Sequence, residues 1–403
     1  MRVVIKPSVA KGTLKAPPSK SMAHRALIAA ALAKGESRLF PIARSEDMLA
    51  TMDCLRELGA DFTVENDAVT VRSSGNLHHR GGVLNCRESG STLRFLLPLC
   101  LLTGERITLC GSPRLMERPL SVYERLCEEN GFLFERGEGS ITVQGRLRAG
   151  EYRVAGNISS QFITGLLFAL STLPEESLLI PEGKRESASY VDMTLRAMAF
   201  FGAEVTEEAF GYRIHPAKGY CAREYEVEGD YSNAAFSEAF NLLGGEVRVE
   251  GLREDSVQGD RVYRKFFPLL KEGSPTLDLS DCPDLAPILF ALASVFHGAV
   301  FTGTARLRMK ESDRGEAMAE ELAKCGGKLD VEENRIVVHP SKLCRPRVSI
   351  RSHNDHRIVM AMSTVLSLVG GKIEGAEAVK KSYPDYFETI RDLGILVEKD
   401  EAE

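Results

Sequence analysis

The chain has 403 residues, of which 43% are hydrophobic and 27% are charged, and its formal net charge is −6. This composition is that of an ordinary globular protein with room for two or three domains. The negative net charge argues against nucleic acid or an anionic membrane as a partner, and no apolar run is long enough to span a bilayer. Nine cysteines are scattered singly, which favours free thiols in a reducing cytoplasm.

The first predicted elements are a strand and turn, followed by a buried helix with an unusual beginning. The opening MRVVIKPSVAKG is typical of a strand and has no apolar signal-peptide core. The segment PPSKSMAHRALIAAALAKG then predicts a buried helix that is capped by Gly35. Its first turn carries Lys20, His24 and Arg25. Because a helix N-terminus is already partly positive, cations there indicate a bound anion.

Segments of the same form, small polar residues followed by an apolar helix, recur along the chain. Their starts are marked by Lys20, Gly90, Ser160, Asp230, Asp284 and Asp355. The intervals between these markers are 70, 70, 70, 54 and 71 residues. Each interval also holds a more polar amphipathic helix and short strands, as in SEDMLATMDCLRELGADFTVE. The chain therefore consists of six helix–strand units, and the short interval predicts that the fourth unit is trimmed.

The six units divide into three plus three. The charged stretch CAREYEVEGD, which begins at Cys221, interrupts the helix–strand pattern and marks the boundary. If the buried helices of each half bundle inside a wall of sheet, their N-termini converge and attract anions. We therefore predict an α/β fold of two domains, with the helix N-termini facing the cleft between them.

Further basic residues lie at matching element boundaries. They are Arg94, Arg114, Arg118, Lys310, Arg314, Arg357 and Lys381. For Lys20 and Arg25 the alternative is a side chain that extends into solvent, but so many matched cations in an acidic protein favour a ligand with several negative groups. Polar residues at the helix starts are instead interpreted as caps: Ser19, Ser159, Asp230 and Asn354.

Two carboxylates lie among these cations. Asp284 lies in CPDLAP at a helix start, and Glu311 lies between Lys310 and Arg314. Taken singly, Asp284 would be an N-cap and Glu311 part of a surface ion pair. Among many cations their pKa values should be lowered, which leaves ionised carboxylates suited to accepting protons.

The usual motifs of other enzyme classes are missing. The sequence has no H-E-x-x-H, no P-loop and no G-x-G-x-x-G. His353 and His356 in HNDHR could ligate a metal, but a capped helix start explains them better. Ser89 has no G-x-S-x-G context, which argues against a serine hydrolase.

Nine motifs occur in order along the chain: PPSKSMAHRALIAAALA, ESGSTLR, PRLMERP, ISSQFITGLL, SYVDMTL, PDLAPILFALA, KESDRGEAMAEEL, NDHRIVMA and SYPDYF. Together they resemble the family of 5-enolpyruvylshikimate-3-phosphate (EPSP) synthases, the 3-phosphoshikimate 1-carboxyvinyltransferases. The resemblance implies an inside-out α/β barrel of two domains, each a threefold repeat. One domain would comprise residues 17–227, and the other residues 1–16 with 228–403.

The resemblance also implies a reaction of the shikimate pathway, on the route to chorismate and the aromatic amino acids. The enolpyruvyl group of phosphoenolpyruvate would pass to the 5-hydroxyl of shikimate 3-phosphate, and phosphate would be released. The reaction would proceed by addition to a tetrahedral intermediate and then elimination, with domain closure over the substrates. We expect no metal or organic cofactor, and a cytoplasmic monomer.

Site residues follow from the matching motifs. Shikimate 3-phosphate would be held by Lys20, Ser21, Arg25, Ser159, Ser160, Gln161, Ser187, Asp284 and Lys310. Phosphoenolpyruvate would be held by Lys20, Gly90, Arg118, Gln161, Arg314, Arg357 and Lys381. In the catalytic group with Lys20, Asp284 is matched to the carboxylate that accepts the 5-hydroxyl proton. Glu311 is matched to the residue that delivers and later removes a proton at the methylene carbon.

Two positions depart from the family pattern, and the sequence argues against three other functions. Glu88 and Arg306 stand where the family commonly has Asn, so neither is assigned a contact. UDP-N-acetylglucosamine 1-carboxyvinyltransferase would need a reactive cysteine in the loop before Arg118, whereas Cys110 lies in the preceding strand. A non-catalytic anion-binding protein would bind both ligands without turnover. A ring-like nucleic-acid clamp conflicts with the acidic net charge.

Overall fold

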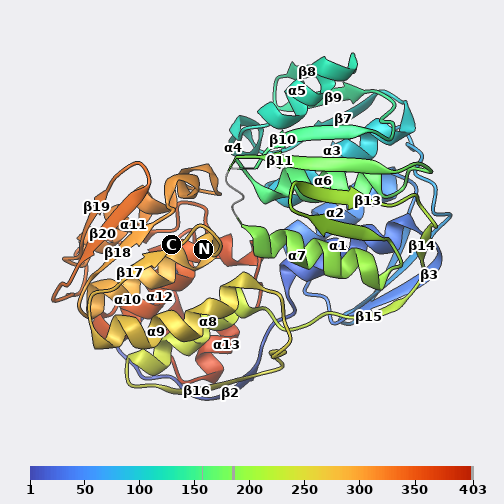
Figure 1. The fold of residues 1–403 in the computed structure, drawn as a ribbon. Helices are drawn as coiled ribbons and strands as arrows, with labels where there is room; N and C mark the ends of the chain where they lie inside the picture. The colour runs from blue at the N-terminus through green and yellow to red at the C-terminus, as the bar shows by residue number, and fades with distance from the viewer. Residues whose placement is uncertain (157, 184–186, 401–403) are drawn as a thin grey trace. The chain divides into compact units, whose positions relative to one another are not determined.

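The computed structural model describes residues 1–156, 158–183 and 187–400, and the chain forms two compact units (Figure 1). The N-terminal unit is Pro18–Val227, and the C-terminal unit combines Met1–Pro17 with Glu228–Glu403. These boundaries lie at residues 17/18 and 227/228, beside the expected 16/17 and 227/228. None of the helices in the described ranges has the length and apolar character that a membrane span requires.

The helices of the N-terminal unit alternate between a buried and an amphipathic type. The buried helices are α1 (Lys20–Leu32), α3 (Gly90–Thr103) and α6 (Ser160–Leu170). The amphipathic helices are α2 (Glu46–Glu57), α5 (Ser121–Asn130) and α7 (Ala188–Phe200), and the short α4 (Pro113–Glu117) precedes α5. Every residue of α1 from Met22 to Leu32 is buried. Because such a helix is apolar on all sides, it is stable only inside the unit.

Three sheets of one topology accompany these helices. In each, a parallel pair is extended by an antiparallel hairpin. The second sheet runs β6 (Leu84–Asn85), β7 (Ile107–Cys110), β9 (Ser140–Gln144), β8 (Leu133–Gly137). The third runs β10 (Glu151–Ala155), β11 (Ser177–Glu182), β13 (Gly211–Ile214), β12 (Val205–Glu208). The repeated order confirms the predicted threefold repeat of this half.

The first sheet joins the two ends of the N-terminal unit. Its strands are β3 (Ala33–Phe40), β5 (Ala68–Ser73) and β4 (Asp61–Glu65), and the parallel partners of β3 are β14 (Tyr220–Cys221) and β15 (Glu224–Glu226). The charged stretch that the sequence marks as a boundary thus supplies the end of β14 and all of β15. The chain leaves the unit only after completing its first repeat.

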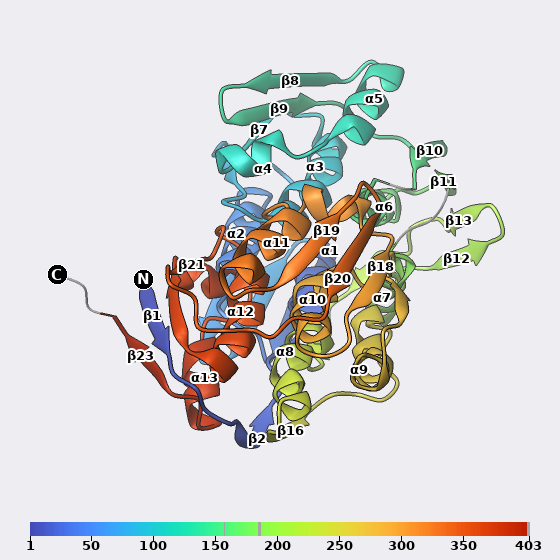
Figure 2. The same cartoon turned by 90° about the vertical axis from the view of Figure 1, so that its left-hand side faces the viewer.

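The C-terminal unit repeats the helix arrangement, as Figure 2 shows for α8, α10 and α12. These buried helices, α8 (Tyr231–Leu242), α10 (Ala286–Val295) and α12 (His356–Val369), pack on one another. The amphipathic helices are α9 (Tyr263–Glu272), α11 (Arg314–Lys324) and α13 (Tyr386–Asp392). Two short 3-10 helices lead directly into α-helices: η1 (Gly259–Val262) into α9 and η2 (Pro283–Leu285) into α10. Two others, η3 (Ala305–Met309) and η4 (Ala376–Lys381), lie in the segments before α11 and α13.

The sheets of the C-terminal unit show which repeat is trimmed. One complete sheet runs β17 (Thr276–Asp278), β18 (Ala299–Thr302), β20 (Arg335–His339), β19 (Lys328–Val331). Another runs β21 (Ile350–Arg351), β22 (Gly371–Glu374), β1 (Arg2–Ile5), β23 (Val397–Lys399), so the chain start completes the last repeat. The fourth repeat has only the parallel pair β2 (Lys11–Lys15) and β16 (Glu246–Glu250). The missing hairpin explains the short interval of 54 residues, and the predicted trimming is confirmed.

Three of the four predicted helix caps are confirmed. Ser19 accepts a hydrogen bond from the Met22 amide, Ser159 from the Gln161 amide and Asp230 from the Asn233 amide. The prediction for Asn354 is wrong, because the cap of α12 is Asp355. Asn354 has φ 53°, a left-handed conformation, whereas an N-cap needs an extended backbone.

The predicted end of the first helix is also wrong. Helix α1 ends at Leu32, and β3 begins at the next residue without a loop. Gly35 therefore lies in β3, opposite Ser73 of β5, with φ 116°. Strand pairing, which the local sequence does not display, has replaced the expected helix cap.

Gly165 of α6 allows a close approach between α6 and α3. A Cβ atom there would lie 2.4 Å from the carbonyl oxygen of Arg94 and 2.5 Å from the hydroxyl of Tyr123. These two atoms are themselves joined, since the Tyr123 hydroxyl donates to the Arg94 carbonyl at 2.6 Å. A methyl group would have to push apart an existing hydrogen bond.

We therefore expect Gly165→Ala to lower the free energy of unfolding by about 1–3 kcal/mol, the usual cost of overpacking. Urea denaturation followed by circular dichroism measures the change. Gly150→Ala is the matched control, because nothing lies within 4 Å of a Cβ at that position. Equal stability of the two variants would contradict the close packing of α6 on α3.

Candidate active site

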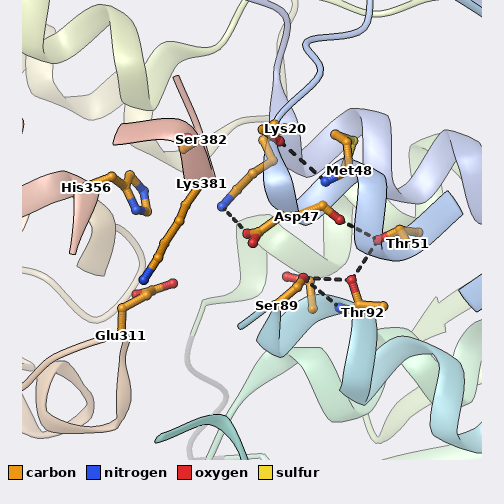
Figure 3. Close-up of polar contacts among 12 residues, drawn as sticks. Lys20, Asp47, Met48, Thr51, Ser89, Thr92, Glu311, His356, Lys381 and Ser382 are labelled. Atoms are coloured by element: carbon orange, nitrogen blue, oxygen red, sulfur yellow. Dashed lines mark hydrogen bonds and ion pairs between the residues drawn. The ribbon is translucent and has the colours of Figure 1, made fainter. Parts of the chain in front are cut away.

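The first cation of the N-terminal unit is held by a carboxylate of a neighbouring helix. Lys20 begins α1, and its Nζ lies 2.8 Å from Oδ2 of Asp47 in the first turn of α2 (Figure 3). The two side chains are only 17% and 11% exposed. Lys20 therefore does not simply extend into solvent. Asp47 was not predicted from the sequence, because nothing local marks it as the partner of a residue 27 positions earlier.

A chain of hydroxyl groups connects α2 to the start of α3. The Thr51 hydroxyl donates to the carbonyl of Asp47 at 3.1 Å and lies 2.7 Å from the Thr92 hydroxyl. The Thr92 hydroxyl donates in turn to Ser89, which caps α3 (Figure 3). The beginnings of α2 and α3 are thus fixed against each other.

The starts of α3 and α6 come together around two arginines. The Gln161 side chain of α6 accepts from Nη1 of Arg94 at 2.7 Å and donates to the Ser91 hydroxyl at 3.0 Å. A Cβ atom on Gly90 would lie 2.6 Å from Nη1 of Arg118. The buried Nε of Arg118 has no hydrogen-bond partner among the described residues. Two guanidinium groups beside helix N-termini make this region attractive to an anion.

Arg25 serves mainly to connect elements. It is 2% exposed and donates three hydrogen bonds of 2.8 Å, to the carbonyls of Ser21 and Tyr190 and to the hydroxyl of Thr194. Burial lowers its pKa to about 10. The alternative of a solvent-exposed side chain is wrong for Arg25, because these bonds tie α1 to α7.

The predicted serine ligands lie at helix starts. Ser159 caps α6 and Ser160 is its first residue, so both lie where free backbone amides point outward. Ser21 lies in the first turn of α1. Ser187 precedes α7 in a left-handed conformation with φ 55°.

In the C-terminal unit, Arg314 is the centre of the charged groups. It begins α11 and is 1% exposed. Its guanidinium lies 2.9 Å from Asp355, 2.7 Å from Asp284 and 2.8 Å from Glu311. Three carboxylates on one buried guanidinium compensate a charge that would otherwise be very costly to bury.

Asp284 is an ionised carboxylate among cations. The alternative interpretation, in which it only caps a helix, is wrong. Its oxygens lie 2.7 Å from Arg314, 3.3 Å from Lys310 and 3.3 Å from Arg357. Burial alone would raise its pKa, but Lys310, Arg357 and Arg314 outweigh burial and hold the pKa well below its usual range. Asp284 lies in η2, just before α10, and its side chain remains 19% exposed.

Glu311 is paired with the buried Arg314, so the ion pair is not the surface ion pair of the alternative interpretation. Figure 3 shows the Lys381 side chain extending toward Glu311, with His356 beside it. Lys381 ends η4 and donates to the backbone carbonyl of Asn354. This places one acid–base group, Glu311, beside a second cation within the same unit.

Arg357 retains donors for a ligand. It lies in the first turn of α12 with its guanidinium 5.5 Å from the centre of the Phe236 ring. One Nη contacts Asp284, but Nε and the other Nη are buried without a partner among the described residues. Unsatisfied buried N–H groups are costly and indicate a missing acceptor, such as a carboxylate or phosphate oxygen.

A further carboxylate, Asp260, was missed by the sequence analysis. It lies in η1 and is 5% exposed. Burial and the negative charge of Asp284 raise its pKa to about 7, against a lowering effect of Arg357. Arg306, one of the two departures from the family pattern, is also buried and donates to the carbonyl of Ser280. The sequence around Asp260 and Arg306 shows neither the raised pKa of the first nor the hydrogen bond of the second.

The raised pKa of Asp260 predicts a pH dependence of stability. The unfolded chain releases this proton near pH 3.8, whereas the folded chain keeps it to about pH 7. In between, the folded state binds more protons, so stability is highest below this window and declines as pH rises, by at most about 1.4 kcal/mol per pH unit. Asp260→Asn should flatten the decline. Urea denaturation midpoints of both proteins are measured from pH 5 to 8. If the midpoints of wild type and variant change with pH to the same extent, the raised pKa of Asp260 is contradicted.

The chain is similar to proteins of one family along nearly its whole length. The sequence profile of the family "EPSP synthase (3-phosphoshikimate 1-carboxyvinyltransferase)" matches residues 4–271 and 266–390. A 3-phosphoshikimate 1-carboxyvinyltransferase of Clostridium kluyveri is 39% identical over 97% of both chains. One from Clostridium perfringens is 38% identical over 98% of both chains.

Solved structures agree with the fold. An EPSP synthase from Acinetobacter baumannii superimposes with a TM-score of 0.78 at 23% identity, covering 98% of this chain and 99% of that one. This likeness confirms the predicted two-domain α/β fold class with its repeated units. With a family profile and close relatives matched along nearly its whole length, the chain belongs to the EPSP synthase family.

Proposed function

We propose that this protein is a 3-phosphoshikimate 1-carboxyvinyltransferase. It transfers the enolpyruvyl group of phosphoenolpyruvate to the 5-hydroxyl of shikimate 3-phosphate and releases phosphate. The observation that carries the proposal, beside family membership, is Asp284: an ionised carboxylate in contact with Lys310, Arg314 and Arg357. That group can accept a hydroxyl proton while the cations beside it hold anionic substrates.

The N-terminal unit would supply most contacts to shikimate 3-phosphate. Ser159 and Ser160, at the start of α6, are suited to its phosphate because free amides and hydroxyls meet there. Gln161 would lie along the ring, and Lys20, Ser21 and Ser187 would complete the contacts. Arg25 would act beside Ser21, whose carbonyl it already fixes. Lys310 and Asp284 of the C-terminal unit would also contact this substrate.

Phosphoenolpyruvate would be bound by cations of both units. Lys20, Gly90, Arg118 and Gln161 belong to the N-terminal unit, and Arg314, Arg357 and Lys381 to the C-terminal unit. The unsatisfied N–H groups of Arg118 and Arg357 support this assignment. Gly90 suits it because a Cβ there would lie 2.6 Å from Nη1 of Arg118, so a side chain would displace the Arg118 guanidinium from its place.

The reaction would proceed in two steps. First, Asp284 takes the 5-hydroxyl proton, the hydroxyl oxygen bonds to C2 of phosphoenolpyruvate, and Glu311 delivers a proton to the methylene carbon. The resulting tetrahedral intermediate carries a methyl group and the phosphate. Glu311 then removes a proton from that methyl group and is restored to its starting form, while the bond from C2 to the phosphate oxygen breaks. The phosphate leaves with the proton that Asp284 had taken, so Asp284 is ionised again. Because one guanidinium, Arg314, contacts both carboxylates, a proton gained by one changes the charge that the other faces.

We propose a cytoplasmic monomer without metal or organic cofactor, which the nine free thiols fit. The alternative of a UDP-N-acetylglucosamine transferase is disfavoured, because residues Pro113–Glu117 before Arg118 form α4 and contain no cysteine. A non-catalytic binding protein is disfavoured by the ionised state of Asp284.

The test of the function is phosphate release from phosphoenolpyruvate, with and without shikimate 3-phosphate. We expect release only with both substrates, and the same rate after dialysis against a chelator. Binding of both ligands by calorimetry without release would favour a binding protein. Loss of release on metal removal would overturn the metal-free mechanism.

Asp284→Ala should lower kcat by about 100-fold or more, because the general base is lost. Binding of shikimate 3-phosphate, measured by calorimetry, should be largely retained, since most of its proposed ligands lie in the N-terminal unit. Asp281→Ala, at an exposed position of the same segment, is the control and should be near wild type. Near-normal turnover of Asp284→Ala would remove Asp284 from the mechanism.

Lys20→Met should weaken both substrates, raising both KM values by about tenfold, because one cation would contact both. Lys34→Met, at an exposed position just beyond the same helix, serves as the control. Steady-state kinetics with each substrate varied in turn gives the two values. A change in neither KM would refute the assignment of Lys20.

A further inference from the structure

The turn that leads into α12 has an unfavourable backbone. The amide of Asp355 donates to the carbonyl of Ser352 at 2.9 Å, which closes a tight turn over His353 and Asn354. Both central residues are left-handed, with φ 49° and 53°. Neither is glycine, and non-glycine residues disfavour this region. Such a turn persists only where its surroundings hold it.

This turn sets three of the cations proposed to bind phosphoenolpyruvate. The carbonyl of Asn354 accepts from Nζ of Lys381. Asp355 contacts Nε of Arg314 at 2.9 Å and also accepts from the Arg357 amide at 2.9 Å as the cap of α12. The Asn354 carbonyl and the Asp355 side chain therefore help to position Lys381, Arg314 and the first turn of α12 that carries Arg357.

The turn is anchored from α11 by a buried carboxylate. Oε1 of Glu321 lies 2.7 Å from Nε2 of His353, and Oε2 accepts from the Arg351 amide at 2.9 Å. Glu321 is 0% exposed, and Lys324 contacts both of its oxygens, at 2.8 and 2.7 Å. One carboxylate thus holds the chain on both sides of Ser352.

Glu320, Glu321 and His353 could suggest a cation site, since their ligand atoms lie within 4.8 Å of one another. Both oxygens of Glu321 are, however, already used by Lys324, Arg351 and His353. Glu320 is itself paired with Arg351. The cluster is better described as a clamp of hydrogen bonds.

We propose that His353 is a positioning residue for phosphoenolpyruvate. Anchored on Glu321, it keeps the left-handed turn in the form that aims the Asn354 carbonyl at Lys381 and Asp355 at Arg314. His353 itself touches no substrate. This inference rests on the proposed function, because it concerns the cations assigned to that substrate.

Two substitutions of His353 distinguish the effect of its contact with Glu321 from the effect of its left-handed backbone. His353→Asn suits a left-handed conformation better than histidine does, but its side chain is too short to reach Glu321. His353→Gln places an amide donor near the position of Nε2 and keeps the contact. If backbone strain alone mattered, Asn would be the better replacement. If the contact matters, Gln is the better one.

We expect His353→Asn to raise KM for phosphoenolpyruvate by about tenfold, while KM for shikimate 3-phosphate changes less than about twofold. His353→Gln should stay within about twofold of wild type for both. Combining His353→Asn with Lys381→Met should raise KM for phosphoenolpyruvate by less than the product of the single effects, because His353 acts in part through Lys381.

Wild-type KM values in His353→Asn, or an equal rise of both KM values, would overturn the inference. If His353→Asn does not fold, His353→Ala takes its place. A wild-type KM for phosphoenolpyruvate in His353→Ala would overturn the inference equally. Wild-type enzyme is assayed in parallel. Absence of shikimate 3-phosphate-dependent turnover there would count against the proposed function, which distinguishes that failure from a failure of the positioning role.

Discussion

Burial of the Arg314 guanidinium is the constraint on which the C-terminal unit depends. A charge that is 1% exposed must be compensated, and three carboxylates from separate segments do so. Asp355 brings the start of α12, Asp284 the start of α10, and Glu311 the segment before α11. Satisfying one cation thus fixes the starts of three helices. The same contacts hold the pKa of Asp284 well below its usual range, so the need for stability and the need for a proton acceptor are met by one set of bonds.

The N-terminal unit solves a related problem with fewer carboxylates. Lys20 is paired with Asp47, but Arg94 and Arg118 lie beside helix starts where the macrodipole is also positive. Part of this positive charge is left for a ligand. An enzyme that handles two phosphorylated carboxylates needs such fixed charge, because groups already in place need no reorganisation as the phosphate charge develops.

Much of the fold could be predicted from the sequence, because a buried helix that is apolar all round recurs visibly at regular spacing. Helix caps at Ser19, Ser159 and Asp230 were equally local. The failures have a common cause. Gly35 and Asn354 are governed by strand pairing and by a turn, and the partners Asp47, Asp260 and Asp355 depend on contacts between segments distant in the chain. That the helix starts face a cleft between the units stays a prediction.

In the proposed reaction, two carboxylates carry protons through an addition and an elimination. Its most direct test is to run the reaction in D₂O and to analyse the product by mass spectrometry. Protonation of the methylene carbon followed by loss of a proton from the methyl group predicts deuterium in the enolpyruvyl methylene of the product, only when shikimate 3-phosphate is present. Phosphate release with no deuterium in that methylene would contradict the mechanism, because the group would have been transferred without a methyl intermediate.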